Sequence, residues 1–127
     1  MKRILFLLMI LFATGMVSAQ QKEASITIVG DVVHDFGNIN ESGGSVSHVF
    51  TVLNNGELPL VISRVIAACG CTTPDWTKEP IAPGKTGEIE VSFDPTSQSG
   101  PFTKTISVYS NGKKGNYVLT IRGDVNK

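Results

Sequence analysis

The sequence predicts an all-β protein: an immunoglobulin-like β-sandwich of about seven strands, preceded by a cleaved signal peptide. From Gln20 onward the chain contains 12 Val, 9 Ile and 10 Thr but only 4 Leu and 4 Ala, and β-branched side chains pack well on a pleated sheet. In the same region 12 Gly and 6 Pro interrupt the chain at short intervals, which indicates many turns. No long segment carries apolar residues at helical spacing.

The N-terminal segment has the composition of an export signal. Lys2 and Arg3 precede an apolar run over residues 4–12, and Ala19 provides the small residue favoured at a signal-peptidase site. This run is well short of the roughly 20 residues that span a bilayer. We therefore expect a signal peptide over residues 1–19, a linker over residues 20–24 and one β-sandwich domain over residues 25–126, with no transmembrane segment in the mature chain.

The first half of the domain is expected to hold three strands. Residues 25–33 form the first strand, which is split or bent near Gly30-Asp31, and Asp35-Phe36-Gly37 leads from strand into turn with Phe36 buried. Residues 46–54 form the second strand, which ends at Asn54-Asn55-Gly56 because Asn and Gly tolerate positive φ. The third strand covers residues 60–68.

The second half is expected to begin with a long loop over residues 72–85, which contains three of the prolines. Residues 86–93 alternate most regularly between apolar and polar side chains, so that Ile89, Val91 and Phe93 share one face of a strand. Residues 102–110 and 116–125 form a hairpin. This number of short strands in about 100 residues is typical of an immunoglobulin-like sandwich.

The charge of the chain argues against a nucleic-acid partner. Eleven Lys and Arg balance 11 Asp and Glu, and loss of Lys2 and Arg3 with the signal peptide leaves a net charge of −2. Binding to phosphates requires clustered basic side chains. We therefore expect no nucleic-acid partner.

Cys69-Gly70-Cys71 is the one unusual group of residues. In an extended strand both sulfur atoms would lie on one side, with the Cα atoms about 7 Å apart. Four interpretations remain open: a local disulfide that draws the Cα atoms together at Gly70 and is easily reduced, a soft-metal site for Cu(I), thiol exchange with a partner protein, and an inert thiol pair. Cys69 and Cys71 are therefore only weak metal candidates, and we expect no cofactor.

The other candidate residues have simpler interpretations. His34 and His48 are more typical of structural histidines than of metal ligands, because their spacing matches no zinc-binding pattern. Thr72 and Trp76 lie in the predicted loop beside the cysteines, where they could contact a partner. The favoured role for Trp76 is to cover the open end of the sandwich.

Several motifs together resemble a known family. They are His34-Asp35-Phe36-Gly37, Asn54-Asn55-Gly56, Cys69-Gly70-Cys71-Thr72, Ile81-Ala82-Pro83-Gly84 and Val91-Ser92-Phe93-Asp94, and their succession resembles the exported bacterial "domain of unknown function 1573" family, which is similar to Hydin-like immunoglobulin-type sandwiches. The resemblance implies this fold and a periplasmic or extracellular bacterial protein. It implies no activity, although the Hydin-like relatives act mainly in binding and scaffolding.

The sequence therefore favours a non-enzymatic function. No acid, base, nucleophile and oxyanion-binding groups can be combined into a recognisable catalytic set. We expect an exported immunoglobulin-like module that binds a protein or a cell-envelope component. The alternative is a thiol protein that uses Cys69 and Cys71 to bind Cu(I) or to exchange disulfides.

Overall fold

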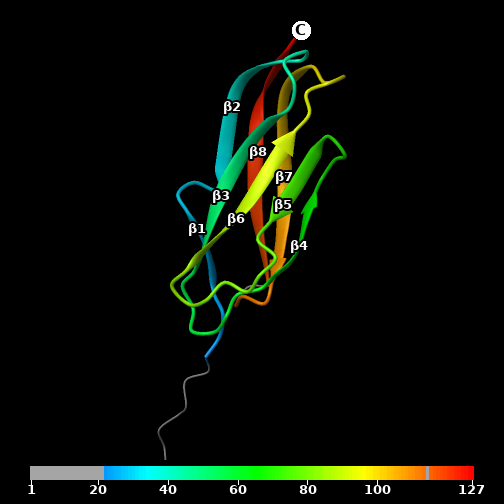
Figure 1. Ribbon diagram of the computed structural model, residues 1–127. Helices are drawn as coiled ribbons and strands as arrows, with labels where there is room; N and C mark the ends of the chain where they lie inside the picture. Colours follow the sequence, from blue (N-terminus) through cyan, green and yellow to red (C-terminus); the bar gives the residue numbers. More distant parts are fainter. Residues whose placement is uncertain (1–21, 114) are drawn as a thin grey trace, which may run out of the picture.

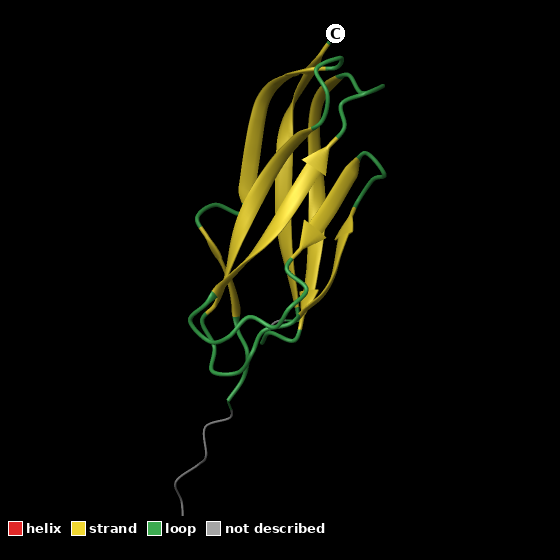
Figure 2. Ribbon diagram, viewed as in Figure 1, coloured by secondary structure: helices red, strands yellow, loops and turns green. Residues whose placement is uncertain are grey.

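The protein forms a sandwich of two four-stranded β-sheets (Figures 1 and 2). The computed structural model describes residues 22–113 and 115–127, and the described residues contain no helix that could cross a membrane. The prediction of an all-β immunoglobulin-like sandwich is confirmed. The expected signal peptide, residues 1–19, and the start of the linker lie outside the described residues. The strands are β1 (Ile26–Val29), β2 (Val33–Asn40), β3 (Val46–Asn54), β4 (Ile62–Ala67), β5 (Thr72–Trp76), β6 (Thr86–Phe93), β7 (Gly100–Ser110) and β8 (Asn116–Asn126).

The chain passes between the two sheets several times. Sheet A has the strand order β1-β3-β6-β5, and sheet B has the order β2-β8-β7-β4. All neighbouring strands are antiparallel except β2 and β8, which are parallel. β1 and β5 are the edge strands of sheet A, and β2 and β4 are the edge strands of sheet B. The short connection from β1 to β2 therefore closes one side of the sandwich, and the connection from β4 to β5 closes the other (Figure 1).

The first predicted strand, residues 25–33, is split near Gly30, one of the two expected forms, but its predicted end at Val33 is wrong. The bend at Gly30, where φ is +93°, separates β1 in sheet A from the start of β2 in sheet B. β2 then continues to Asn40 through a bulge between Asp35 and Asn38, so Gly37, with φ at +70°, bends the strand without ending it. Phe36 is half-buried against the core rather than fully buried.

The prediction of a loop over residues 72–85 is also wrong at its start. Residues 72–76 form β5, which pairs with β6 at the edge of sheet A. Pro74 lacks a backbone N–H, and an edge strand tolerates it because only one side of the strand is paired. With this strand and the division of the first one, the sandwich has eight strands instead of about seven.

The core lies between the two sheets and is built from alternate side chains of each strand. Phe50, Val91 and Ile106 are 2%, 0% and 0% exposed, in agreement with the strand faces expected from the sequence. Leu119 and Ile121 of β8 are also buried. They lie in sheet B together with Ile106, whereas Phe50 and Val91 belong to sheet A. This alternation fixes which side chains of each strand remain on the outer surface.

Candidate functional site

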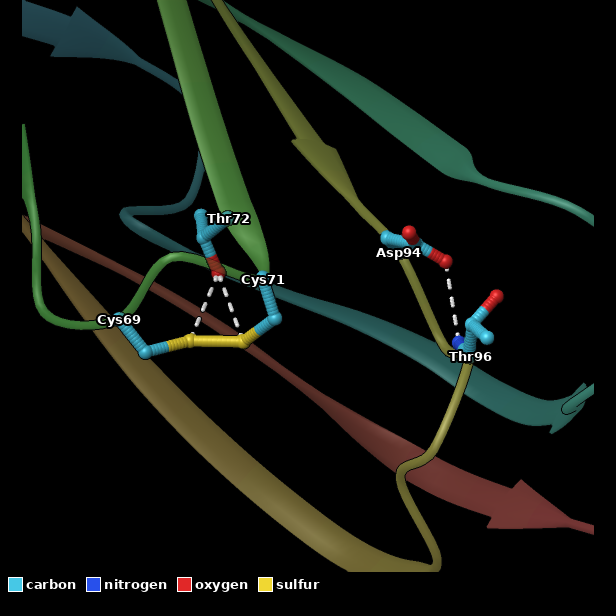
Figure 3. The surroundings of a disulfide bond; sticks show 5 residues. All are labelled: Cys69, Cys71, Thr72, Asp94 and Thr96. Carbon is cyan, nitrogen blue, oxygen red and sulfur yellow. Dashed lines mark hydrogen bonds between the residues drawn. A yellow bond between two sulfur atoms is a disulfide. The ribbon is translucent and has the colours of Figure 1, made fainter.

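The two cysteines lie at the corner where the chain crosses from β4 in sheet B to β5 in sheet A. Cys69 and Cys71 are joined by a disulfide, and their Cα atoms are 5.4 Å apart (Figure 3). A bend at Gly70 brings the Cα atoms together, and the N–H of Thr72 donates a hydrogen bond to the carbonyl of Cys69 at 3.2 Å. Both cysteines are half-buried, and Cys71 packs against the core.

The hydroxyl of Thr72 points at the disulfide (Figure 3). Its Oγ1 lies 3.8 Å from the Sγ atoms of both Cys69 and Cys71. A disulfide sulfur carries no hydrogen, so the hydroxyl is the donor in these weak hydrogen bonds. Thr72 is only 4% exposed, which makes it a buried neighbour of the sulfur atoms and leaves it little surface for a partner.

The backbone of the corner is tied to the end of β6. The N–H of Asp94 donates a hydrogen bond to the carbonyl of Cys71 at 2.8 Å. The carboxylate of Asp94 turns away from the disulfide and accepts a hydrogen bond from the N–H of Thr96 at 3.0 Å (Figure 3). That hydrogen bond lowers the pKa of Asp94, because it stabilises the charged form.

Trp76 lies at the other end of β5 and is half-buried against the core. The ammonium of Lys78 sits 3.1 Å from the centre of the Trp76 ring and 3.4 Å from Oδ1 of Asp75. Lys78 was not among the residues predicted to form a site, although its spacing of two residues from Trp76 is a signal for a shared face. The indole Nε1 of Trp76 is buried and has no hydrogen-bond partner among the described residues.

An acidic strip lies on the outer face of sheet A beside this tryptophan. Asp75 of β5 is directly opposite Glu90 of β6, and Glu88 follows on the same face. These carboxylates, with Trp76 and Thr77, line a surface pocket of about 230 Å³. The sequence places Glu88 and Glu90 on a solvated face, and both are exposed, but only the pairing of β5 with β6 brings Asp75 next to them.

The structure also brings the two histidines together. His34 of β2 and His48 of β3 stack with ring centres 3.6 Å apart and planes 8° from parallel. Phe36 and Phe50 contact the two rings edge-on. Burial, and secondarily the neighbouring His34, lower the pKa of His48. The shared His-x-Phe pattern of both strands was the available signal, but the sequence does not show that β2 and β3 face each other across the sandwich.

The stacked histidines do not form a chelating pair. Parallel rings direct their nitrogen lone pairs side by side instead of toward a common point, which is the arrangement a metal ion requires. Within the part of the chain that the structure describes, no three His, Cys, Asp or Glu side chains are grouped as metal ligands. The pair therefore acts as packing between the two sheets.

Solved structures share this fold at low sequence identity. A protein of unknown function from Porphyromonas gingivalis W83 has a TM-score of 0.71 and 15% identity, with 85% of this chain and 50% of that chain covered. The ASH/PapD-like domain 7 of human CEP192 has a TM-score of 0.66 and 8% identity, with 87% and 92% covered. The YadV chaperone has a TM-score of 0.59 and 14% identity, with 81% and 53% covered.

These similarities establish the fold, and the family follows from the sequence match. The chain spans half the length of the P. gingivalis protein, and no curated protein matches it. The family described as "Protein of unknown function (DUF1573)" matches residues 26–125, which is nearly all of the sandwich. The chain belongs to the DUF1573 family.

Proposed function

We propose that the protein is an exported, non-enzymatic binding module, and that its acidic strip beside Trp76 binds a basic segment of another protein. The observation that carries this proposal is the position of Asp75 directly opposite Glu90, with Glu88 close by. Like charges opposite each other on a sheet are destabilising. Lys78 contacts only Asp75 among these carboxylates, so a cation from a partner would offset the remaining repulsion.

Trp76 provides the second part of the binding surface. The position of Lys78 over the indole ring shows that this side chain accepts an ammonium group by a cation–π interaction. A lysine or arginine of a partner would make the same contact and would also reach Glu88 or Glu90. The chaperone among the similar structures supports a role in protein binding.

The sole tryptophan of the sequence makes this proposal directly measurable. Because Trp76 is the only tryptophan, its fluorescence reports on the proposed surface when a decalysine peptide is titrated into the protein. We expect saturable binding that weakens with added salt, and no response to a decaglutamate peptide. The double variant Glu88→Gln/Glu90→Gln should bind at least about tenfold more weakly, which corresponds to about 1.4 kcal/mol.

A control variant separates this surface from the overall charge. Asp31→Asn/Glu57→Gln removes the same number of charges from exposed positions outside the strip and should bind as the wild type does. Lys78→Ala should bind more tightly, because it removes the internal cation from the Trp76 ring. Equal weakening in both double variants, or binding to isolated cell-wall material that Glu88→Gln/Glu90→Gln leaves unchanged, would contradict a basic protein segment as the partner.

The disulfide favours a second candidate function, thiol–disulfide exchange with a partner. Both cysteines are half-buried residues at a corner between two edge strands, and on this proposal an external thiol approaches the disulfide there. Binding of Cu(I), the other thiol chemistry expected from the sequence, requires both sulfur atoms as thiolates. It therefore applies only to the reduced protein.

A further inference from the structure

We infer that an external thiol attacks the disulfide at Cys69 and that Cys71 is the leaving sulfur, stabilised by the hydroxyl of Thr72. This inference rests on the second candidate function and adds a direction to the exchange. It follows from one difference between the cysteines, namely that only Cys71 packs against the core. The hydroxyl of Thr72 lies 3.8 Å from both sulfur atoms, so it can stabilise the sulfur that leaves.

Cys71 packs against the core, whereas Cys69 does not. The backbone carbonyls of both cysteines accept hydrogen bonds, from Asp94 at Cys71 and from Thr72 at Cys69, so the packing of Cys71 is what distinguishes them. At Gly70, between the two cysteines, an added Cβ would meet no other atom within 4 Å, so no described residue covers the bend at that position.

The hydroxyl of Thr72 stabilises the sulfur of Cys71 when it becomes the leaving group. Among the described residues, its buried hydroxyl has hydrogen-bond contacts only with the two sulfur atoms. When the disulfide opens, the sulfur of Cys71 becomes a thiolate, and a hydrogen bond to a charged acceptor is stronger than one to a neutral acceptor. This contact stabilises the thiolate form of Cys71, and a sulfur that is more stable as a thiolate leaves faster.

The exchange proceeds in two steps. A thiolate of glutathione or of a dithiol protein attacks Sγ of Cys69, a new disulfide forms between them, the Cys69–Cys71 bond breaks and its electron pair passes to Sγ of Cys71. A second external thiolate then attacks the external sulfur of the mixed disulfide and releases Cys69 as a thiolate. Two external thiols are thereby oxidised to one disulfide, the protein gains two electrons, and the two cysteines take up the two protons.

Reduction should leave the strands on both sides of the corner in place. The bond spans only two residues, so it closes a small loop and constrains the unfolded chain weakly. The N–H of Ala68 donates to the carbonyl of Thr105 on β7, and β5 is paired with β6. Both of these attachments are independent of the disulfide.

The direction of attack can be read from the first intermediate. The oxidised protein is mixed with excess reduced glutathione, quenched with acid within the first turnover, alkylated at its free thiols and analysed by tandem mass spectrometry. We expect glutathione on Cys69 and the alkyl group on Cys71 in at least about tenfold excess over the reverse pattern, given that about 1.4 kcal/mol separates rates by this factor. Glutathione mainly on Cys71, or in equal amounts on both, would overturn the inference and leave the exchange function intact.

A complete lack of reduction in folded protein would overturn both the inference and the exchange function. Thr72→Val tests the role of the hydroxyl, with Thr73→Val as the matched control, because Thr73 is the exposed neighbour on β5. In reduced protein, Thr72→Val should raise the pKa of the Cys71 thiol, measured by the pH dependence of its alkylation. It should also slow reduction by glutathione on the order of tenfold, whereas Thr73→Val should change neither quantity.

A third variant separates the hydroxyl from the packing of Thr72. Thr72→Ser keeps the hydroxyl and loses only a methyl group, so it should restore both the pKa and the rate. Circular dichroism establishes that each variant is folded. If Thr72→Val does not fold, Thr72→Ser carries the test, because its thiol pKa and its rate must match those of the wild type. Unchanged pKa and rate in folded Thr72→Val, or a failed match in Thr72→Ser, would contradict the role of Thr72.

Discussion

Asn54 connects three parts of the chain at one end of the sandwich. Its side chain is fully buried, and its Nδ2 donates hydrogen bonds to the carbonyls of Leu58 and Ile81 at 2.7 and 2.8 Å. Its Oδ1 accepts hydrogen bonds from the N–H groups of Gly56 and Ser25 at 3.0 and 3.4 Å. All the polar groups of the amide therefore have partners, which is the condition for a polar side chain to be stable in a core.

Replacing Asn54 should be far more costly than replacing its neighbour. Asn54→Ala removes the four hydrogen bonds of a fully buried side chain. We expect the free energy of unfolding to fall by about 2–4 kcal/mol, since each unsatisfied buried group costs about 1–3 kcal/mol. Asn55→Ala is the control, because Asn55 is exposed. Urea denaturation measures both values, and similar small losses would show that these hydrogen bonds do not stabilise the fold.

For single residues, the sequence predicts the local backbone conformation that a residue favours, but not which distant residues contact its side chain. Asn54-Asn55-Gly56 was expected only as a turn, because Asn and Gly tolerate positive φ. The buried role of Asn54 depends on Ser25 and Ile81, which are distant in the chain. Cys69 and Cys71 were identified as the unusual pair for the same local reason, whereas the contact of His34 with His48 depends on how two strands meet.

At the scale of the strands, those with regular apolar and polar alternation were predicted, whereas the edge strand β5 was not. The alternating burial of β6 follows from its sequence, because its inner face is buried and its outer face is exposed. β5 contains Pro74 and mostly polar side chains, a composition that resembles a loop. A split between β1 and β2 near Gly30 was expected as one of two forms, but an apolar run does not show in which sheet each half will pair.

The bulge in β2 provides a test of backbone conformation with a matched control. Gly37 has φ at +70°, whereas the φ of Gly70 is outside the left-handed region, and an added Cβ at either position would meet no atom within 4 Å. Gly37→Ala should therefore lower the free energy of unfolding by about 1–2 kcal/mol, the cost of a left-handed residue with a Cβ.

Gly70→Ala should behave in the opposite way. Where the native φ suits alanine, the substitution restricts the unfolded chain and stabilises the protein by about 0.4–1 kcal/mol. Thermal denaturation of the two oxidised variants compares them directly. Equal effects at both positions would contradict the assignment of the Gly37 cost to its φ.

For the whole molecule, the histidine pair makes stability depend on pH. The pKa of His48 lies below its ordinary value of 6.5 in the folded protein, so the unfolded chain binds more protons as the pH falls below that value. Stability rises with pH wherever the unfolded state binds more protons. The contribution of His48 should therefore be complete above about pH 7.5 and decline below about pH 6.5.

Variants distinguish this effect from the titration of carboxylates. The pKa of Asp94 is lowered from 3.8, so its contribution is present above that pH and is lost only in stronger acid. His48→Phe keeps an aromatic ring against His34 and should remove most of the decline between pH 7 and 5 in urea denaturation. An unchanged slope in this variant would show that the stacked pair does not carry the pH dependence.

The parallel pairing of β2 with β8 has a consequence for the order in which the protein can assemble during synthesis. β8 lies between β2 and β7 in sheet B, so the last of the eight strands fills the gap that separates β2 from the rest of its sheet. Until Asn116–Asn126 has emerged, β2 has no neighbour, and only β7 and β4 can pair in that sheet. Domains fold as units. A chain from which β8 has not yet emerged would therefore remain open, and it would close into the sandwich only after β8 arrives.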